Sequence, residues 1–337
     1  MQKSEYIVDD LQNLSLDIYT IGYPGMGETI LTMICEGNTV LFTTLTDCYI
    51  TSDCNYVSNI LNQRGVSAID AFIWTHPDVD HSVGICDVLS QFDSLHKAKV
   101  YLPEEFHNGI RYKVCNEAMD ALSYLKENYS VRSDYNVCTV GVTENETRGL
   151  IRLRFKEKHG EKKIRCQWQF MAPFGELAWR QVSKDNFTLN DLSIVYSMHF
   201  NDVNFFFFFY LAERSVKFMD SQYLQNVYFI KIPHHGSCND NSGFIRKLQE
   251  NQVKGALSVT TSFQSTHPYP ETLEAYKNIS CEIDCTGDAA HTVEKYGCIK
   301  ASFNICSLVH QTELSGNAFC YYRQMENHIT DALCYKD

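Results

Sequence analysis

A nearly continuous apolar run at residues 69–75 restricts the folds open to this chain more than any other segment, because such a run is typical of a strand buried on both faces of a sheet. Residues 82–92 follow with apolar side chains at helical spacing. Strands and helices also alternate before and after a β-rich middle that begins near residue 135. This order predicts an α/β protein with two sheets face to face and helices outside them.

Periodicity and turn residues predict the individual elements. The expected strands lie within residues 17–34 and at 39–44, 69–75, 100–102, 150–156, 162–170, 192–198, 203–211, 216–219 and 255–260, with another near 229. The expected helices lie at 55–64, 82–92, 119–125, 242–251 and 270–276. Because the sequence has no internal repeat, linker or low-complexity tract, residues 1–337 are expected to form a single domain.

Composition limits the classes of function. A net charge of −12 argues against a nucleic-acid coat or a membrane-surface protein, since both normally carry a basic surplus. It leaves room for an enzyme that holds a phosphate through metal ions. The N-terminal residues lack the apolar core of a signal peptide, and the longest apolar run, 205–212, is too short to span a bilayer. With these features, the 14 cysteines indicate free thiols and a cytoplasmic protein.

Four ionisable side chains follow the apolar run within six positions: His76, Asp78, Asp80 and His81. A loop beyond the carboxyl end of a strand is where α/β proteins tend to bind ligands. Imidazoles and carboxylates together suit zinc, manganese or iron. A solvated turn is the alternative interpretation, but charges placed directly after a desolvated strand need compensation, which a metal supplies.

Three further segments repeat this pattern. His234 and His235 follow the apolar strand near residue 229, His267 lies between threonine and proline ahead of a helix, and Asp220 is expected to end the strand at 216–219. Each alone is more typical of a capping aspartate or an ordinary loop histidine than of a metal ligand. Their joint occurrence in one chain favours a shared metal site.

The motif H-x-D-x-D-H at residues 76–81 resembles the metal motif of the metallo-β-lactamase superfamily. Its second position, Asp78 where histidine is more usual, resembles the hydrolase domain of the competence protein ComEC and its stand-alone relatives. Residues 231–237 (KIPHHGS), 258–259 (SV) and 267–271 (HPYPE) match further signatures, and residues 27–31 resemble the opening hairpin. The resemblance covers about residues 15–305, and 306–337 are expected to pack on that core as a C-terminal extension.

The resemblance implies a four-layer αββα sandwich, the metallo-β-lactamase fold, with two divalent metal ions (Zn or Mn) at one edge. The implied ligands are His76 and Asp78 on one ion, Asp80 and His81 on the other, Asp220 between them, and His235 and His267 completing the two shells. Whether His234 or His235 is the ligand stays open, and the other would contact substrate or move a proton.

A pair of metals clamps a phosphoryl oxygen and produces hydroxide near neutral pH, so the expected activity is hydrolysis of phosphodiester bonds, most plausibly by a nuclease. Asp80 and His234 are the expected catalytic residues. The alternatives are a small-molecule phosphodiesterase or esterase acting on a cyclic nucleotide, a phosphocholine-type ester or a lactone, and a metal-stabilised regulatory protein with little activity. The expected partner is a nucleic acid or a small phosphodiester; no membrane is involved, and the sequence does not indicate a protein partner.

A basic stretch at residues 148–165 stands out in this acidic chain. Its members Arg152, Arg154 and Lys156 alternate with apolar residues, which predicts a half-buried strand with a basic face. That face is either a solvated hairpin or a track for nucleic-acid phosphates. The five phenylalanines at 205–209 are expected to form a core strand instead of a base-stacking surface.

Three positions depart from the family pattern. An aspartate usually present near residues 41–44 is missing, with Asp47 three residues later. Met219 replaces a glycine before Asp220, and Val83 replaces the first glycine of a pair. None removes an expected metal ligand, so we expect activity with a divergent substrate pocket.

Overall fold

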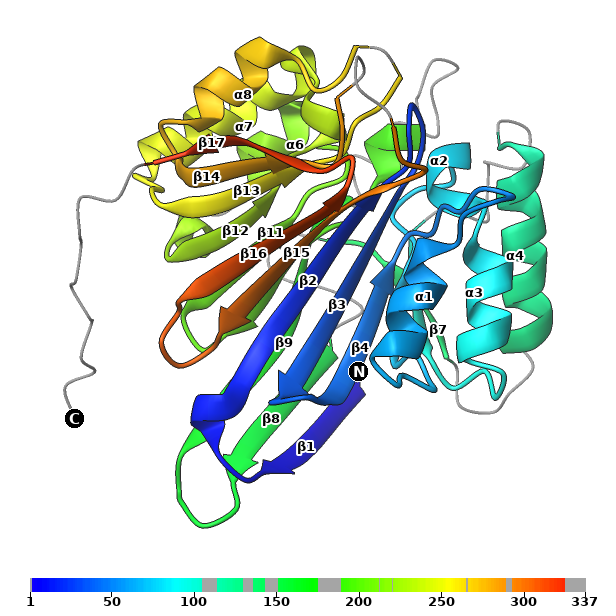
Figure 1. Ribbon diagram of the computed structural model, residues 1–337, viewed down its shortest axis with the longest axis vertical. Coiled ribbons are helices and arrows are strands. Elements are labelled where there is room, and N and C mark those ends of the chain that lie inside the picture. The colour runs from blue at the N-terminus through cyan, green and yellow to red at the C-terminus, as the bar shows by residue number, and fades with distance from the viewer. Residues whose placement is uncertain are drawn as a thin grey trace.

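A computed structural model describes residues 2–104, 114–129, 136–142, 151–174, 189–211, 213–219, 221–264, 266–288 and 293–324. These residues form two large mixed sheets with helices around them (Figure 1). The predicted α/β class and its two-sheet arrangement are therefore confirmed. Among the described helices, none combines the length and apolar character needed to cross a bilayer.

Within the described residues, the larger sheet has nine strands and the smaller has eight. The order in the larger sheet is β1 (Gln2–Val8), β8 (Ile151–Glu157), β9 (Lys163–Ala172), β10 (Val195–Phe200), β11 (Val203–Phe207), β12 (Val227–Lys231), β13 (Ala256–Thr260), β14 (Ser280–Cys285) and β17 (Phe319–Arg323). The order in the smaller sheet is β16 (His310–Gly316), β15 (Gly297–Asn304), β2 (Leu14–Gly22), β3 (Glu28–Glu36), β4 (Thr39–Thr46), β5 (Ala71–Ile73), β6 (Lys99–Pro103) and β7 (Val137–Val140). Thus β16 and β17, from the segment expected to be an extension, each complete the edge of a sheet.

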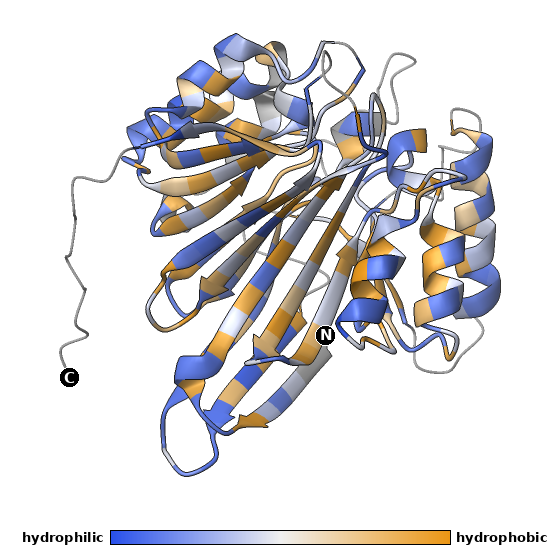
Figure 2. Ribbon diagram, viewed as in Figure 1, coloured by the Kyte–Doolittle hydropathy of each residue, from blue (hydrophilic) through white to orange (hydrophobic). Residues whose placement is uncertain are grey.

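Two groups of helices cover the sheets. The apolar faces of α1 (Tyr56–Gln63), α3 (Ile85–Phe92) and α4 (Asn116–Tyr129) share one core cluster with strands of the smaller sheet. The helices α6 (Glu213–Phe218), α7 (Cys238–Glu250) and α8 (Pro270–Tyr276) share another with the larger sheet. Figure 2 shows apolar and polar residues alternating along the strands, and α1, α3 and α4 with an apolar side and a polar side. This is the pattern expected of elements with one buried face.

The phenylalanine run explains how the larger sheet is buried on both faces. Phe205 and Phe207 belong to the core between the sheets, whereas Phe206 and Phe208 belong to the core under α6–α8. All four side chains are fully buried. The prediction of a core strand is confirmed, although β11 ends at Phe207, earlier than residue 211.

One predicted strand is wrong. Residues 216–219 were expected to form a strand, but Val216 lies in the short helix α6, and Met219 directly follows it. Val216 and Met219 are three residues apart, so both face the core beneath α7, and Lys247 of α7 donates hydrogen bonds to their carbonyl oxygens. A short apolar run has no period long enough to distinguish a helix from a strand.

Candidate metal centre

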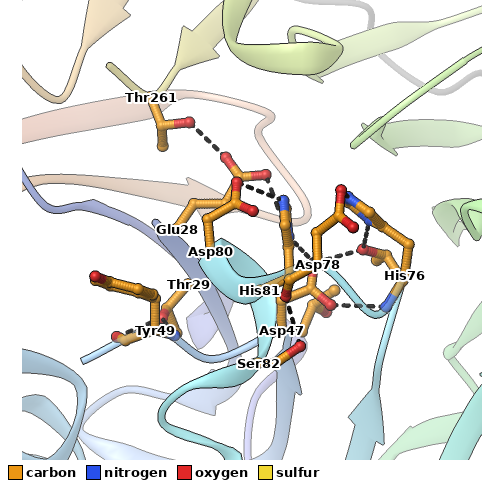
Figure 3. Close-up of polar contacts among 12 residues, drawn as sticks. Glu28, Thr29, Asp47, Tyr49, His76, Asp78, Asp80, His81, Ser82 and Thr261 are labelled. Atoms are coloured by element: carbon orange, nitrogen blue, oxygen red, sulfur yellow. Dashed lines mark hydrogen bonds and ion pairs between the residues drawn. The ribbon is translucent and has the colours of Figure 1, made fainter. Parts of the chain in front are cut away.

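The loops after β5 and β12 bring the predicted ligands together between the two sheets. His76 and Asp78 lie in the loop after β5, and Asp80 and His81 lie on the single-turn helix α2 (Val79–Ser82). His235 comes from the loop after β12. Figure 3 shows His76, Asp78, Asp80 and His81 with their polar ends turned toward one another. The sequence motif therefore forms one compact cluster.

Asp80 lies at the middle of this cluster. Its Oδ2 is 3.2 Å from Nε2 of His81 and 3.5 Å from Nε2 of His235. All three side chains are buried. The two imidazoles thus face the same carboxylate oxygen, although their positions in the chain are far apart.

Asp78 faces His76 in the same manner, with its Oδ2 3.7 Å from Nε2. Asp78 occupies the N-cap of α2, where its backbone carbonyl accepts hydrogen bonds from His81 N and Ser82 Oγ. Within the described residues, however, its carboxylate makes no capping hydrogen bond. This geometry disfavours the interpretation of Asp78 as an ordinary helix cap.

The hydrogen bonds at Nδ1 fix the orientation of the three imidazoles. Thr75 Oγ1 donates to Asp47 Oδ2, at 2.5 Å, so it accepts from His76 Nδ1, at 2.9 Å. Thr261 Oγ1 likewise donates to Glu28 Oε2 and accepts from His235 Nδ1, at 2.7 Å. A hydroxyl has a single proton to donate, and each is committed to a carboxylate, so both rings carry their proton on Nδ1.

His81 completes the set, because its Nδ1 donates to Asp47 Oδ2 at 2.7 Å. Each imidazole therefore turns Nε2 toward the carboxylates of Asp78 or Asp80. A ring held through Nδ1 by an outer partner, with Nε2 directed at the ion, is the usual arrangement of histidine ligands. The donor set of imidazole nitrogens and carboxylate oxygens fits zinc or manganese.

Burial and nearby charges shift the pKa values of the three imidazoles in different directions. Burial, with the nearby His81 charge, holds the pKa of His76 well below its usual range, and burial also lowers the pKa of His235. For His81 burial acts in the same direction, but the carboxylates of Asp80 and Asp47 outweigh it and raise its pKa well above the usual range. Divalent-metal binding at His81 would therefore release a proton.

A buried ion pair forms the wall behind the cluster. Lys231 Nζ lies 2.9 Å from Glu28 Oε2, and neither side chain is exposed by more than 1%. Burial alone would raise the pKa of Glu28, but the charges of Lys231, His235 and His81 lower it to about 2. Glu28 Oε1 is also 3.9 Å from His81 Nδ1, and Glu28 Oε2 is 3.8 Å from His235 Nδ1. Glu28 therefore adds negative charge beside these two imidazoles.

The structure separates the two adjacent histidines. His235 is buried against Asp80, whereas His234 is partly exposed and its ring centroid lies 6.2 Å from that of His267. His234 and His267 thus lie beside the buried cluster, and His267 Nδ1 hydrogen-bonds to Thr266 Oγ1. Asp220, the predicted bridging ligand, lies outside the described residues.

A strained turn holds these histidines in place. His234, His235 and Gly236 have φ values of 46°, 50° and 80°, all in the left-handed region. A Cβ on Gly236 would lie 2.7 Å from Pro268 Cβ, so only glycine lets the His267 loop pack this closely. Consecutive left-handed residues are costly and concentrate at functional sites.

Sequence reasoning gave no role to Glu28 or Asp47. The family pattern places an aspartate near residues 41–44, and Asp47 was noted only as coming three residues later; β4 continues to Thr46, so Asp47 directly follows the strand. Asp47 is fully buried, and its carboxylate accepts from Thr75 and His81. The strand end directly before a buried loop was the available signal for Asp47.

The basic strand is placed away from this cluster. The predicted half-buried strand is confirmed, and Arg152 on it is exposed. Arg154 Nη1 lies 3.6 Å from Glu5 Oε2, and Lys156 Nζ lies 2.6 Å from Glu5 Oε1. Arg152 pairs with Gln167 of β9, whose far end at Ala172 adjoins the loop after β5. At about 3.3 Å per residue, the basic side chains lie roughly 15 to 30 Å along the sheet from the cluster. Arg148, in the same basic stretch, lies outside the described residues.

Asp47→Asn is expected to weaken metal binding by about 10- to 100-fold, because His81 loses the carboxylate that orients it. Titration of manganese into metal-stripped protein measures this change. Asp53→Asn is the matched control, since Asp53 is in the same loop but pairs with Lys295 at the exposed surface. Equal affinities in the two variants would show that Asp47 does not position His81 for a metal.

No model of a known protein family matches this chain, and no curated protein matches it either. The family resemblance therefore rests on the motifs and stays a prediction.

Proposed function

We propose that this protein is a metal-dependent phosphodiester hydrolase, most plausibly a nuclease, of the metallo-β-lactamase fold with its four-layer αββα order. One observation carries the proposal: three buried imidazoles are fixed through Nδ1 and direct Nε2 at the carboxylates of Asp78 and Asp80. Any buried ring nitrogen needs a hydrogen-bond partner, but an outer partner at Nδ1 with Nε2 directed at carboxylates is the arrangement usual for histidine ligands of a metal.

In the proposed site, His76 and Asp78 would hold one divalent ion, and Asp80, His81 and His235 would hold the other. Asp220 and His267 remain the proposed further ligands. When bound, such ions supply positive charge to a phosphoryl oxygen and lower the pKa of water. The protein holds its ligands by outer hydrogen bonds from Asp47, Thr75 and Thr261. Burial keeps the cluster largely dry, which strengthens every charge interaction within it.

His234, beside the cluster, is proposed to contact the substrate or to transfer a proton to it. His234 is partly exposed, lies next to His267, and has a ring centroid 5.1 Å from that of Tyr210. Its place at the border of the buried cluster suits a group that contacts a phosphate or moves a proton to the leaving oxygen. Asp80, facing two imidazoles, is proposed to fix the position of the attacking group.

Two substrates separate the hypotheses. Purified protein is assayed with added manganese or zinc on bis-(p-nitrophenyl) phosphate and on plasmid DNA. A nuclease cleaves both, a small-molecule phosphodiesterase cleaves only the first, and a regulatory protein cleaves neither. Failure with both substrates under both metals would overturn the proposed hydrolase.

Reversing the charges of Arg152, Arg154 and Lys156 to glutamate tests whether the basic strand contacts DNA. We expect KM for plasmid DNA to rise and the salt dependence of binding to flatten by about one unit of slope for each phosphate that the variant no longer neutralises. The kcat/KM for bis-(p-nitrophenyl) phosphate should not change. Lys126→Glu, exposed on α4, is the control. Unchanged DNA cleavage would identify the basic strand as a solvated face.

A further inference from the structure

A second group of potential metal ligands lies where β14, β17 and β16 meet. Glu282 and Asp284 alternate along β14, so their side chains share one face. Cys320 of β17 is paired directly across from Asp284 and therefore shares that face too. Thr312 of β16, in the other sheet, donates to Glu282 Oε1 at 2.9 Å, so this face lies between the sheets. One donor atom from each of Glu282, Asp284 and Cys320 lies within 4.8 Å of the other two.

Asp284 is the unusual member of this group. It has no exposed surface, and within the described residues neither of its carboxylate oxygens has a hydrogen-bond partner. Burial and the neighbouring Glu282 charge raise its pKa to about 7. A buried carboxylate without a partner is expensive to keep ionised, so a proton or a cation is needed to stabilise it.

Glu282, by contrast, is already paired. Its Oε1 lies 2.5 Å from Arg323 Nη2, and its Oε2 faces His310 Nε2 at 3.7 Å. Although burial would raise the pKa of Glu282, these partners lower it to about 2. Glu282 thus presents Oε2 toward His310, while Arg323 and Thr312 hold Oε1.

The chemical types of the donor atoms and their total charge indicate which cation would bind here. Two carboxylates and a thiolate carry three negative charges, which a divalent ion and the Arg323 guanidinium balance. The Cys320 thiol would give up its proton on binding a metal, because a metal binds the thiolate. Sulfur and oxygen donors with an imidazole nearby suit a transition metal such as zinc, and exclude calcium and magnesium as preferred ions.

We propose that Glu282, Asp284 and Cys320 form a second, separate site for a divalent transition-metal ion, with His310 at its border. An open pocket of about 1000 Å³ reaches the border of this group, where Glu282, His310, Thr312 and Arg323 line it. Val259 lies between Asp284 and Lys231 in the sheet, so two strand spacings, roughly 10 Å, separate the backbone of Asp284 from that of Lys231, which lies behind the first site. The proposal does not depend on the hydrolase, because the two sites share no ligand.

Cobalt(II) tests this site directly, because a cobalt–thiolate bond gives a near-ultraviolet charge-transfer band. The described ligands around Asp80 are imidazoles and carboxylates, so cobalt bound there gives no such band. We expect the band in metal-stripped full-length protein after cobalt is added, and its loss in Cys320→Ser and Asp284→Asn. Cys238→Ser, an exposed cysteine, and His76→Ala, in the first site, should both retain it.

Zinc content gives a second readout. Mass spectrometry of dialysed protein should find one zinc ion fewer per chain in Cys320→Ser than in Cys238→Ser, with the two circular dichroism spectra alike. Absence of the cobalt band from the wild-type protein would overturn the proposal, as would a band unchanged in Cys320→Ser. If Asp284→Asn fails to fold, the comparison of wild type with Cys320→Ser still decides the question.

Discussion

We expect Asp80→Asn to lower kcat/KM for bis-(p-nitrophenyl) phosphate by more than about a hundredfold, a larger loss than removal of an outer partner of a metal ligand would cause. The reason is charge: Oδ2 of Asp80 faces Nε2 of both His81 and His235, and an amide at this position lacks the negative charge that would hold the proposed dication between them. Steady-state assays at saturating manganese, with metal content measured on the same samples, give the result.

Asp87→Asn is the control for this substitution, because Asp87 is exposed on the adjacent helix α3. It should retain wild-type activity and metal content. If Asp80→Asn also retains both, the buried cluster is a structural ion network and the proposed centre is wrong.

Glu28→Gln is expected to lower the free energy of unfolding by about 3–5 kcal/mol, because it leaves the Lys231 charge buried without its partner. Lys231 has no exposed surface, and its remaining described contacts are the Ile232 carbonyl, at 3.2 Å, and the face of the Phe209 ring. Urea denaturation in the presence of a chelator measures this change without a contribution from bound metal.

Two controls distinguish the buried pair from an ordinary surface pair. The double variant Glu28→Gln/Lys231→Met should recover most of the lost stability, since it removes both charges. Glu5→Gln, which breaks an exposed pair with Lys156, should change stability little. A Glu28→Gln protein as stable as Glu5→Gln would show that Lys231 is solvated.

The same pair predicts an acid dependence. The pKa of Glu28 is lowered to about 2 from an ordinary value of 4.5, so its stabilisation is complete above about pH 4.5 and is lost as the pH falls toward 2. Glu28→Gln has no carboxylate to protonate, so this part of the acid sensitivity should be missing from its unfolding curves.

Two strands buried on both faces were predictable from the sequence, and so was the ligand-bearing loop that follows the first of them. Residues 69–75 and 203–211 were expected to contain strands because apolar side chains occupy consecutive positions, and β5 and β11 lie within these ranges. His76, Asp78, Asp80 and His81 were predicted to act together because local spacing alone places them on one loop and one helical turn.

Residues that reach the site from distant strands were not predictable in the same way. Glu28 begins β3, yet its partners are Lys231, in β12 of the other sheet, and Thr261, directly after β13 of that sheet. Nothing in the local pattern around Glu28 distinguishes a buried carboxylate from one that faces water, since its environment is set by the packing of the two sheets. At Val216 and Met219 the prediction failed for a different reason. The local apolar pattern was present, but it fitted both a strand and the observed helix.

Metal content tests the central claim most directly. Metal-stripped protein is dialysed against manganese, and the bound ion is counted per chain for the wild type and for His76→Ala/Asp80→Asn/His81→Ala. Manganese favours oxygen and nitrogen donors, so it reports mainly on this cluster and only weakly on the thiolate site. The account predicts two manganese ions fewer per chain in the triple variant. Equal manganese content in the two proteins would contradict it.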